Sequence, residues 1–218
     1  MALDRFLDLF LQRKCPLCGR STPDFVCIYC SRALLACQAA QFCELKTPLP
    51  LFRWGVYDDA LKRAIATCKY NHQPRIATFL GQQMGIRWQK EKDTQKLPKM
   101  AVVPIPLHPD KLKQRGFNQA ELLARGFCDI TSMPCRPDLL QRVKNTKPQM
   151  ETKSVQARKD NLDGAFITVK NKTKQPILLV DDIYTSGATM TAAVTTLTQA
   201  GYKIGAMLVL ARTGLHDR

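Results

Sequence analysis

The sequence lacks any long apolar run and any recognisable targeting segment. No stretch of its 218 residues approaches the ~20 consecutive apolar residues that cross a bilayer, so we do not expect an integral membrane protein. A basic start followed by an apolar core and a small-residue cleavage site, the marks of a secretory signal, is also missing. The chain contains no internal repeat and no low-complexity segment. We therefore expect a globular protein in the cytoplasm.

Acidic residues are scarce relative to basic ones. Lys and Arg together number 33 against 18 Asp and Glu, which gives a formal net charge of +15. This imbalance favours anionic partners such as nucleic acid, nucleotides or an acidic membrane surface. Aromatic residues make up only 7%, with Trp54, Tyr70, Phe117 and Tyr184 as candidates for stacking on bases. Binding to a nucleic acid should therefore be largely electrostatic.

The first part of the chain predicts a metal site. Cys15 with Cys18 and Cys27 with Cys30 form two Cys-x-x-Cys knuckles, separated by eight residues. This spacing can place four thiolates around one tetrahedral ion, and zinc is the default occupant. The alternative, disulfide or redox chemistry, is less favoured because a cytoplasmic chain gains little from structural disulfides. With no open ligand position, the zinc would be structural and would stabilise a segment too short to fold by burial alone.

The other five cysteines suggest no chemistry. Cys37 and Cys43 form no further knuckle, and we interpret them as buried apolar residues, although they could substitute at the metal site. Cys68, Cys128 and Cys135 lie in apolar or helical surroundings that indicate nothing catalytic.

The length predicts one α/β core with a small appendage. We expect residues 1–46 to hold an N-terminal helix and a zinc-ribbon-like four-cysteine module, and residues 47–218 to form the main domain. The amphipathic segment Met1 to Leu11 has an acidic polar face, so docking on the protein is a better interpretation than a membrane-surface helix.

The main domain alternates strands and helices. This order predicts βαβ units and a mostly parallel sheet flanked by helices. We expect an exposed loop over 89–99. The strands are expected over 101–106, 166–169, 177–180 and 204–210, and the helices over 60–69, 75–90, 120–125 and from about 188 to 199.

The segment 177–189, ILLVDDIYTSGAT, combines a buried strand, two carboxylates and a loop suited to phosphate. Asp181 and Asp182 follow Val180, at the carboxyl end of a strand, where parallel sheets bind ligands. The loop offers hydroxyls, a glycine and backbone N–H groups that open a helix, a combination that binds phosphate. The loop residues are Thr185, Ser186, Gly187, Ala188 and Thr189. It is not a Walker loop, because it lacks the glycine-lysine pair. The alternative is a simple helix cap, which needs only one of these residues.

Two basic segments predict further anion contacts. Lys111, Lys113 and Arg115 follow the predicted strand 101–106 and suit a second anion, although a solvated basic turn is the alternative. Residues 142–160 form a flexible basic loop in our interpretation, with Glu151 as its single acidic residue between Arg142 and Lys159. Such a loop could close over a ligand or contact the phosphates of a single strand.

The order of these motifs resembles the ComF family, which includes the related GntX branch. The resemblance covers nearly the whole chain from Cys15 to Arg212, and its C-terminal half is similar to type I phosphoribosyltransferases. One departure is that many members carry a second pair of Cys-x-x-Cys knuckles, of which only Cys37 and Cys43 remain here. The matching residues are the four knuckle cysteines, Pro104-Ile105-Pro106-Leu107-His108, Arg115-Gly116-Phe117-Asn118-Gln119, Arg142, Thr146, Gln149, Arg158, Asn161, Gly164-Ala165-Phe166 and the Asp-Asp loop.

The resemblance implies a role in natural competence. ComF-type proteins help incoming single-stranded DNA cross the inner membrane with a partner helicase and other uptake proteins, which implies a location in the cytoplasm or at the inner membrane surface.

The phosphoribosyltransferase motif implies a site for phosphoribosyl pyrophosphate (PRPP). Asp181 and Asp182 would contact the ribose hydroxyls and the loop 185–189 the 5′-phosphate. Lys111 or Arg115 with Mg²⁺ would meet the pyrophosphate, and Arg142 or Arg158 would reach in from the flexible loop.

Three functions remain open at this point. The first is a DNA-uptake factor whose pocket binds a nucleotide-like group. The second is an active PRPP-dependent phosphoribosyltransferase of nucleotide metabolism, for which no acceptor pocket or general base can be assigned. The third is a zinc-bearing adaptor that docks other proteins.

Overall fold

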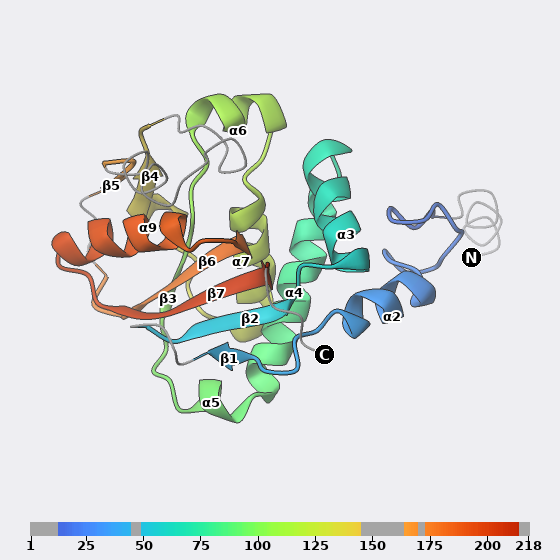
Figure 1. Cartoon of the computed structure of the whole chain (residues 1–218), viewed down its shortest axis with the longest axis horizontal. Helices are drawn as coiled ribbons and strands as arrows, with labels where there is room; N and C mark the ends of the chain where they lie inside the picture. The colour runs from blue at the N-terminus through green and yellow to red at the C-terminus, as the bar shows by residue number, and fades with distance from the viewer. Residues whose placement is uncertain (1–12, 45–48, 145–163, 170–172, 214–218) are drawn as a thin grey trace, which may run out of the picture.

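The structure, a computed structural model, describes residues 13–44, 49–144, 164–169 and 173–213 (Figure 1). The predicted N-terminal helix and most of the basic loop, including Thr146, Gln149 and Arg158, lie outside these ranges, as does Asn161. The elements are α2 (Ile28–Ala36), β1 (Cys43–Glu44), β2 (Leu51–Val56), α3 (Asp59–Tyr70), α4 (Pro74–Lys90), α5 (Lys92–Gln95), β3 (Ala101–Pro104), α6 (Pro109–Arg115), α7 (Gln119–Thr131), η1 (Pro137–Leu139), β4 (Leu140–Arg142), β5 (Phe166–Thr168), β6 (Ile177–Tyr184), α9 (Ala188–Gln199) and β7 (Ile204–Arg212).

The central sheet is mostly parallel. Its strands lie in the order β1-β2-β7-β6-β3, and every neighbouring pair is parallel except β1 with β2 at one edge. The strands β3 and β6 are apolar on both faces, which is typical of a sheet covered on both sides. The predicted α/β class with a mostly parallel sheet flanked by helices is confirmed.

The two faces of the sheet bury separate apolar clusters. On one face Val102, Leu178 and Leu208 pack with residues of α3, α4 and α7. On the other face Val103, Leu179 and Val209 pack with residues of α9 and of the β4–β5 ribbon. Figure 1 shows α9 on one side of the sheet and α4 with α7 on the other. Because side chains alternate along a strand, consecutive residues of β6 enter different layers.

Helices α4 and α7 lie unusually close together. A Cβ placed on Gly81 would lie 2.1 Å from the carbonyl oxygen of Leu123, and one on Gly126 would lie 2.2 Å from that of Thr78. Glycine at both positions therefore allows the two backbones to touch. This contact fixes the positions of α4 and α7 on one face of the sheet. The first residues of α7 lie near the carboxyl edge of the sheet.

Several predicted elements are confirmed with changed ends. Helices α3, α4 and α9 match their predicted ranges closely, whereas α7 continues six residues beyond Arg125, to Thr131. Strand β3 ends at Pro104 rather than at residue 106. Strand β6 continues past Val180 to Tyr184, because β7 extends beside it to Arg212.

Two expectations about the main domain were wrong. The segment 89–99 is not simply an exposed loop: it contains α5, and Thr94 is buried with its hydroxyl donating to the carbonyl of Glu91 at 2.7 Å. The strand expected over 166–169 is confirmed as β5, but it pairs with β4 in a separate antiparallel ribbon and not with the central sheet. Trp54 is fully buried in β2, so it cannot stack on a base.

The N-terminal module contacts the helical layer. The ring of Phe25 lies 6.0 Å from that of Phe79 in α4, and the guanidinium of Arg75 lies over it at 4.7 Å. The boundary predicted near residue 46 stays a prediction. Among the described residues, every helix is too short or too polar to cross a bilayer.

Candidate phosphate site and metal centre

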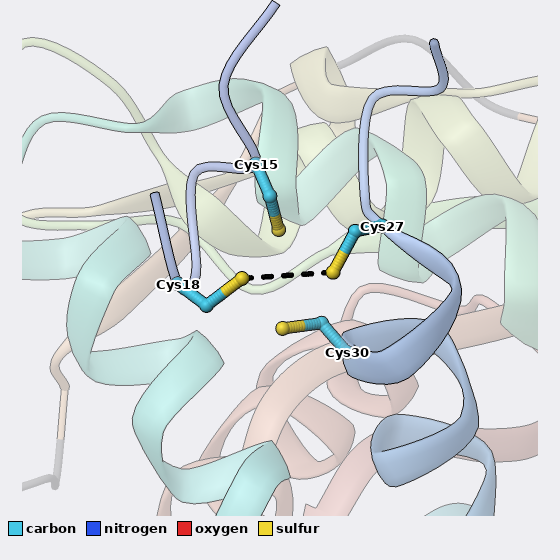
Figure 2. Close-up of side chains that lie close together, drawn as sticks. All are labelled: Cys15, Cys18, Cys27 and Cys30. Atoms are coloured by element: carbon cyan, nitrogen blue, oxygen red, sulfur yellow. Dashed lines mark hydrogen bonds between the residues drawn. The ribbon is translucent and has the colours of Figure 1, made fainter. Parts of the chain in front are cut away.

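Four thiols converge in the N-terminal module. The Sγ atoms of Cys15, Cys18, Cys27 and Cys30 all lie within 4.8 Å of one another, and those of Cys18 and Cys27 are 3.5 Å apart (Figure 2). A tetrahedral zinc with Zn–S bonds of ~2.3 Å requires sulfurs about 3.8 Å apart. The four cysteines predicted as ligands are therefore brought together at a spacing that fits one zinc ion.

Local backbone geometry builds this cluster. Gly19 adopts a left-handed φ of +73°, and its N–H donates to the carbonyl of Cys15 at 2.8 Å, which closes the first knuckle. Cys27 stands just before α2 and Cys30 lies in its first turn. Burial raises the pKa of Cys15, but hydrogen bonds from the backbone N–H groups of Cys27, Leu17 and Cys18 outweigh it and lower the pKa to about 7. Amides that favour a thiolate are suited to a metal ligand.

The two aspartates of the predicted ribose site lie within β6. Asp181 pairs with Val209 in the ladder with β7, so the backbone at this point is still part of the sheet. The two side chains line different cavities. Asp182 lines one with Ile65 of α3 and Leu123 of α7, whereas Asp181 lines another with Thr185.

The predicted phosphate loop surrounds the second cavity. This cavity, of about 20 Å³, is lined by Asp181, Ile183, Tyr184, Thr185, Gly187, Thr189 and Met190. Gly187 has a left-handed φ of +76° and immediately precedes α9, whose N-terminus therefore opens at the cavity. Ser186 is exposed beside it and Ala188 begins the helix. Helix N-termini present free N–H groups and a positive dipole end, both of which favour phosphate.

Asp182 is held by an ion pair with a residue that the sequence analysis missed. Lys69, near the end of α3, places its Nζ against Asp182 Oδ2, and both side chains are largely buried. Burial pushes the pKa of Asp182 upward, but the charge of Lys69 outweighs it and leaves that pKa lowered. The sequence does contain one indication that Lys69 is buried: it follows Cys68 and lies four residues after Ile65, on the buried side of an amphipathic helix.

Asp181 has the opposite electrostatics. Its Oδ1 accepts the backbone N–H of Asp182 at 2.8 Å. Burial, reinforced by the charge of Asp182, raises the pKa of Asp181 well above its usual range. Arg142, at the end of β4, lies close enough to interact with Asp181: burial lowers the pKa of Arg142 and Asp181 opposes that shift. The structure thus brings Arg142 toward the predicted site.

The segment Arg115 to Gln119 has a clear local role. Gly116, with φ of +83°, ends α6, and Asn118 begins α7 by accepting the N–H of Ala120 at 3.1 Å. Asn118 Nδ2 also donates to the carbonyl of Ile105 at 3.0 Å, and Arg115 donates to Gln119. This motif therefore fixes α6, which carries Lys111 and Arg115, after the carboxyl end of β3. Whether α6 binds an anion stays a prediction.

The remaining cysteines behave as packing residues. Cys37 and Cys43 are partly buried against the core, as expected. Cys68 is buried, and burial raises its pKa to about 11, which keeps the thiol protonated. Cys128 and Cys135 are partly buried against the same core.

Curated proteins similar to this chain are competence proteins. Competence protein F of Haemophilus influenzae is 32% identical over 141 residues, which is 62% of this chain and 61% of that protein. Competence protein ComFC of Bacillus subtilis is 27% identical over 190 residues, covering 86% of this chain and 72% of its own length. The chain is similar in sequence to curated competence proteins of the ComF and ComFC type. It spans less than two thirds of the length of the Haemophilus protein, and no family model matches the chain.

Solved structures with a similar fold include phosphoribosyltransferases. The adenine phosphoribosyl transferase of Trypanosoma brucei, solved with AMP, pyrophosphate and ribose-5-phosphate, covers 86% of this chain and 81% of its own, at 10% identity and a TM-score of 0.41. A likeness of this size bears on neither ligand nor function. The fold assignment therefore stands on the sheet topology described above.

Proposed function

We propose that this protein is a ComF-type competence factor that helps single-stranded DNA cross the inner membrane into the cytoplasm. The observation that carries the proposal is the homology to competence protein F and ComFC, which extends over 62% and 86% of the chain. The net charge of +15 supports it, because contacts to phosphates dominate affinity for DNA. A competence helicase and other uptake proteins at the inner membrane are the proposed partners.

We assign the DNA contacts to the zinc module and the basic loop 142–160. In the module Tyr29 is 63% exposed, and the guanidinium of Arg20 lies 4.9 Å from its ring centroid. An exposed aromatic ring beside an arginine is suited to stacking on bases while it contacts the backbone. Arg142 and Lys144 begin the basic loop, and Lys153 and Arg158 continue it outside the described residues.

Salt dependence tests the electrostatic character of this binding. If about four phosphates are neutralised, affinity for a single-stranded oligonucleotide falls about 50-fold between 50 and 200 mM salt. Fluorescence anisotropy with a labelled oligonucleotide measures this slope. Affinity that is unchanged by salt, or absent at low salt, contradicts the proposal.

We assign a ribose 5-phosphate group to the pocket formed by Asp181 and the loop 185–189. The support is the left-handed Gly187 before α9, the hydroxyl residues Thr185 and Thr189 around the cavity, and a carboxyl group beside them. A carboxyl group that recognises the ribose 2′-hydroxyl finds no such group on DNA. The pocket and the DNA surface are therefore separate sites in this proposal.

Transformation with labelled DNA tests both sites in cells. We compare Asp181→Asn/Asp182→Asn with Lys153→Ala/Arg158→Ala and follow label in the cytosol. Lys96→Ala/Lys99→Ala is the matched control, because it removes two exposed charges near the amino end of β3, away from the carboxyl edge. Loss in both test strains, with a normal control, is the expected result. If uptake of label is lost only in the second strain, the pocket is not needed for DNA uptake. If uptake is lost in neither strain, the proposal is contradicted.

The second candidate function is a PRPP-dependent phosphoribosyl transfer, favoured by the phosphate-type loop and its neighbouring carboxyl groups. Breaking the bond at the anomeric carbon develops charge on pyrophosphate, so the protein must hold both ends of PRPP. In this scheme Asp181 and Asp182 orient the ribose and the loop holds the 5′-phosphate. Lys111 or Arg115 with Mg²⁺ meets the pyrophosphate, and Arg142 or Arg158 reaches in from the loop. Calorimetry with Mg-PRPP tests this: no binding heat from a protein that binds DNA excludes it.

A further inference from the structure

Lys69 reaches the acidic pair from the helical layer rather than from the open edge of the site. It follows Cys68 near the end of α3, on the side of the helix that also carries the buried Ile65. Its ammonium contacts Asp182, and the two side chains retain only 16% and 10% of their exposure. The cavity between them and Gln119 has a volume of about 10 Å³. A charge buried to this degree is stable only when it is paired.

The ion pair engages Asp182 from inside the protein. Asp182 Oδ1 accepts the backbone N–H of Ile183 at 2.9 Å, while Oδ2 faces Lys69. Asp181 accepts the N–H of Asp182 at 2.8 Å, interacts with the carboxyl group of Asp182, and lines the cavity of the phosphate loop. One carboxyl group is therefore anchored in the helical layer, and its neighbour faces the loop.

Charged and titratable groups reach this pair from several elements. They are Asp181 and Asp182 of β6, Cys68 and Lys69 of α3, Arg115 of α6 and Arg142 of β4, whereas α7 contributes the uncharged Gln119. Burial raises the pKa of Asp181, and the charge of Asp182 adds to this shift. Burial lowers the pKa of Lys69, but Asp182 outweighs it, so the lysine stays protonated. Asp182 is therefore the more acidic of the two carboxyl groups.

We propose that Lys69 is a positioning residue of the ribose site, a role that rests on the proposed binding of a ribose 5-phosphate group. Its ammonium keeps Asp182 as an anionic hydrogen-bond acceptor. The anion of Asp182 in turn favours the protonated form of Asp181, which can donate to a sugar hydroxyl.

Carboxyl NMR tests the electrostatic part without any ligand. Aspartate is labelled with ¹³C at the carboxyl carbon, and Asp181→Asn and Asp182→Asn assign the two signals. In wild type and in Lys69→Arg, Asp182 should stay ionised to lower pH than Asp181. In Lys69→Met its titration should move upward by about 1–3 pH units, because the opposite charge is gone. Lys69→Met/Asp182→Asn removes both charges and serves as the folding control. Unchanged titrations in Lys69→Met overturn the proposal.

Calorimetry with ribose 5-phosphate tests the positioning role. The ratio of variant to wild-type affinity is compared at pH 5 and pH 6.5, which cancels the titration of the phosphate itself. For Lys69→Met this ratio should be about 10-fold lower at pH 5 than at pH 6.5, because Asp182 becomes protonated in the variant and one pH unit of titration corresponds to one decade. For Lys69→Arg the ratio should be the same at both pH values. A uniform loss means a structural role only and overturns the assignment. If wild type binds no ribose 5-phosphate, the ribose site itself fails, whatever the NMR titrations give.

Discussion

Replacing Gly187 by alanine should damage the phosphate loop in two separable ways. Gly187 has φ of +76°, and alanine in the left-handed region costs about 1–2 kcal/mol. The new Cβ would also lie 2.2 Å from Tyr184 Oη and 2.6 Å from Tyr184 Cζ, so the ring must move. Displacing a packed side chain costs about 1–3 kcal/mol more. The sum is a loss of roughly 2–5 kcal/mol in the free energy of unfolding.

Gly201→Ala is the matched control for backbone strain. Gly201 has φ of +85°, and a Cβ there meets nothing within 4 Å. It should therefore lose only the left-handed cost of about 1–2 kcal/mol. Tyr184→Ala removes the ring that the new Cβ would meet. Adding Gly187→Ala to Tyr184→Ala should therefore cost no more stability than Gly201→Ala costs in the wild-type protein.

Urea unfolding and calorimetry with ribose 5-phosphate measure the two effects. Gly187→Ala should bind at least about 10-fold more weakly, since ~1.4 kcal/mol of lost contact energy corresponds to one decade. Gly201→Ala should bind like wild type. Equal stability losses and equal affinities in the two variants would refute the view that Tyr184 and Gly187 together shape the loop.

Four further outcomes are expected elsewhere in the molecule. Purified protein should contain one zinc per chain, and Cys27→Ser or a strong chelator should expose the module to protease; unchanged cleavage after metal removal contradicts a structural metal. Gly126→Ala should lower stability by about 1–3 kcal/mol despite better helix propensity, because its Cβ meets the carbonyl of Thr78 at 2.2 Å; a stabilised variant in urea refutes this close contact. Asp182→Asn should lower the free energy of unfolding by about 3 kcal/mol at pH 7, because it leaves the buried ammonium of Lys69 unpaired. This difference from wild type should shrink as the pH falls through the lowered pKa of Asp182, because the wild-type carboxylate is then protonated too. A pH-independent difference in denaturant titrations excludes the ion pair as its cause. Tyr29→Ala should weaken single-strand binding by about 1–3 kcal/mol, whereas Tyr70→Ala, which removes an even more exposed ring outside the module, should not; equal anisotropy curves for both variants exclude the module from the DNA surface.

Short-range patterns were sufficient to predict the parts of the site that are local in sequence. The two knuckles place their cysteines by spacing alone, and the structure brings all four Sγ atoms within 4.8 Å. The apolar run before Asp181 predicts a strand buried on both faces, which β6 is. The left-handed turn at Gly187 is also local, because glycine adopts this conformation without support from distant residues.

Long-range partners could not be predicted in the same way. Lys69 meets Asp182 only because α3 packs on the face of the sheet that Asp182 enters, and no local pattern records that meeting. The β4–β5 ribbon joins segments on either side of the basic loop, so its pairing depends on tertiary structure. Trp54 was a stacking candidate because of its residue type, whereas burial in β2 decides its role.

The extension of β6 beyond Val180 determines how the two aspartates can work. Had the strand ended there, both carboxyl groups would have stood on a loop and could have turned toward one ligand. Because β7 pairs with β6 as far as Tyr184 and Arg212, the backbone at Asp181 and Asp182 is fixed by the sheet. Strand alternation then sends Asp182 toward α3 and α7 and leaves Asp181 at the phosphate loop. The loop begins from a rigid base directly after Tyr184, and sites on rigid elements hold their geometry better than sites on loops. The acidic pair is therefore two different groups: Asp182, which Lys69 holds from within, and Asp181, which faces the phosphate loop.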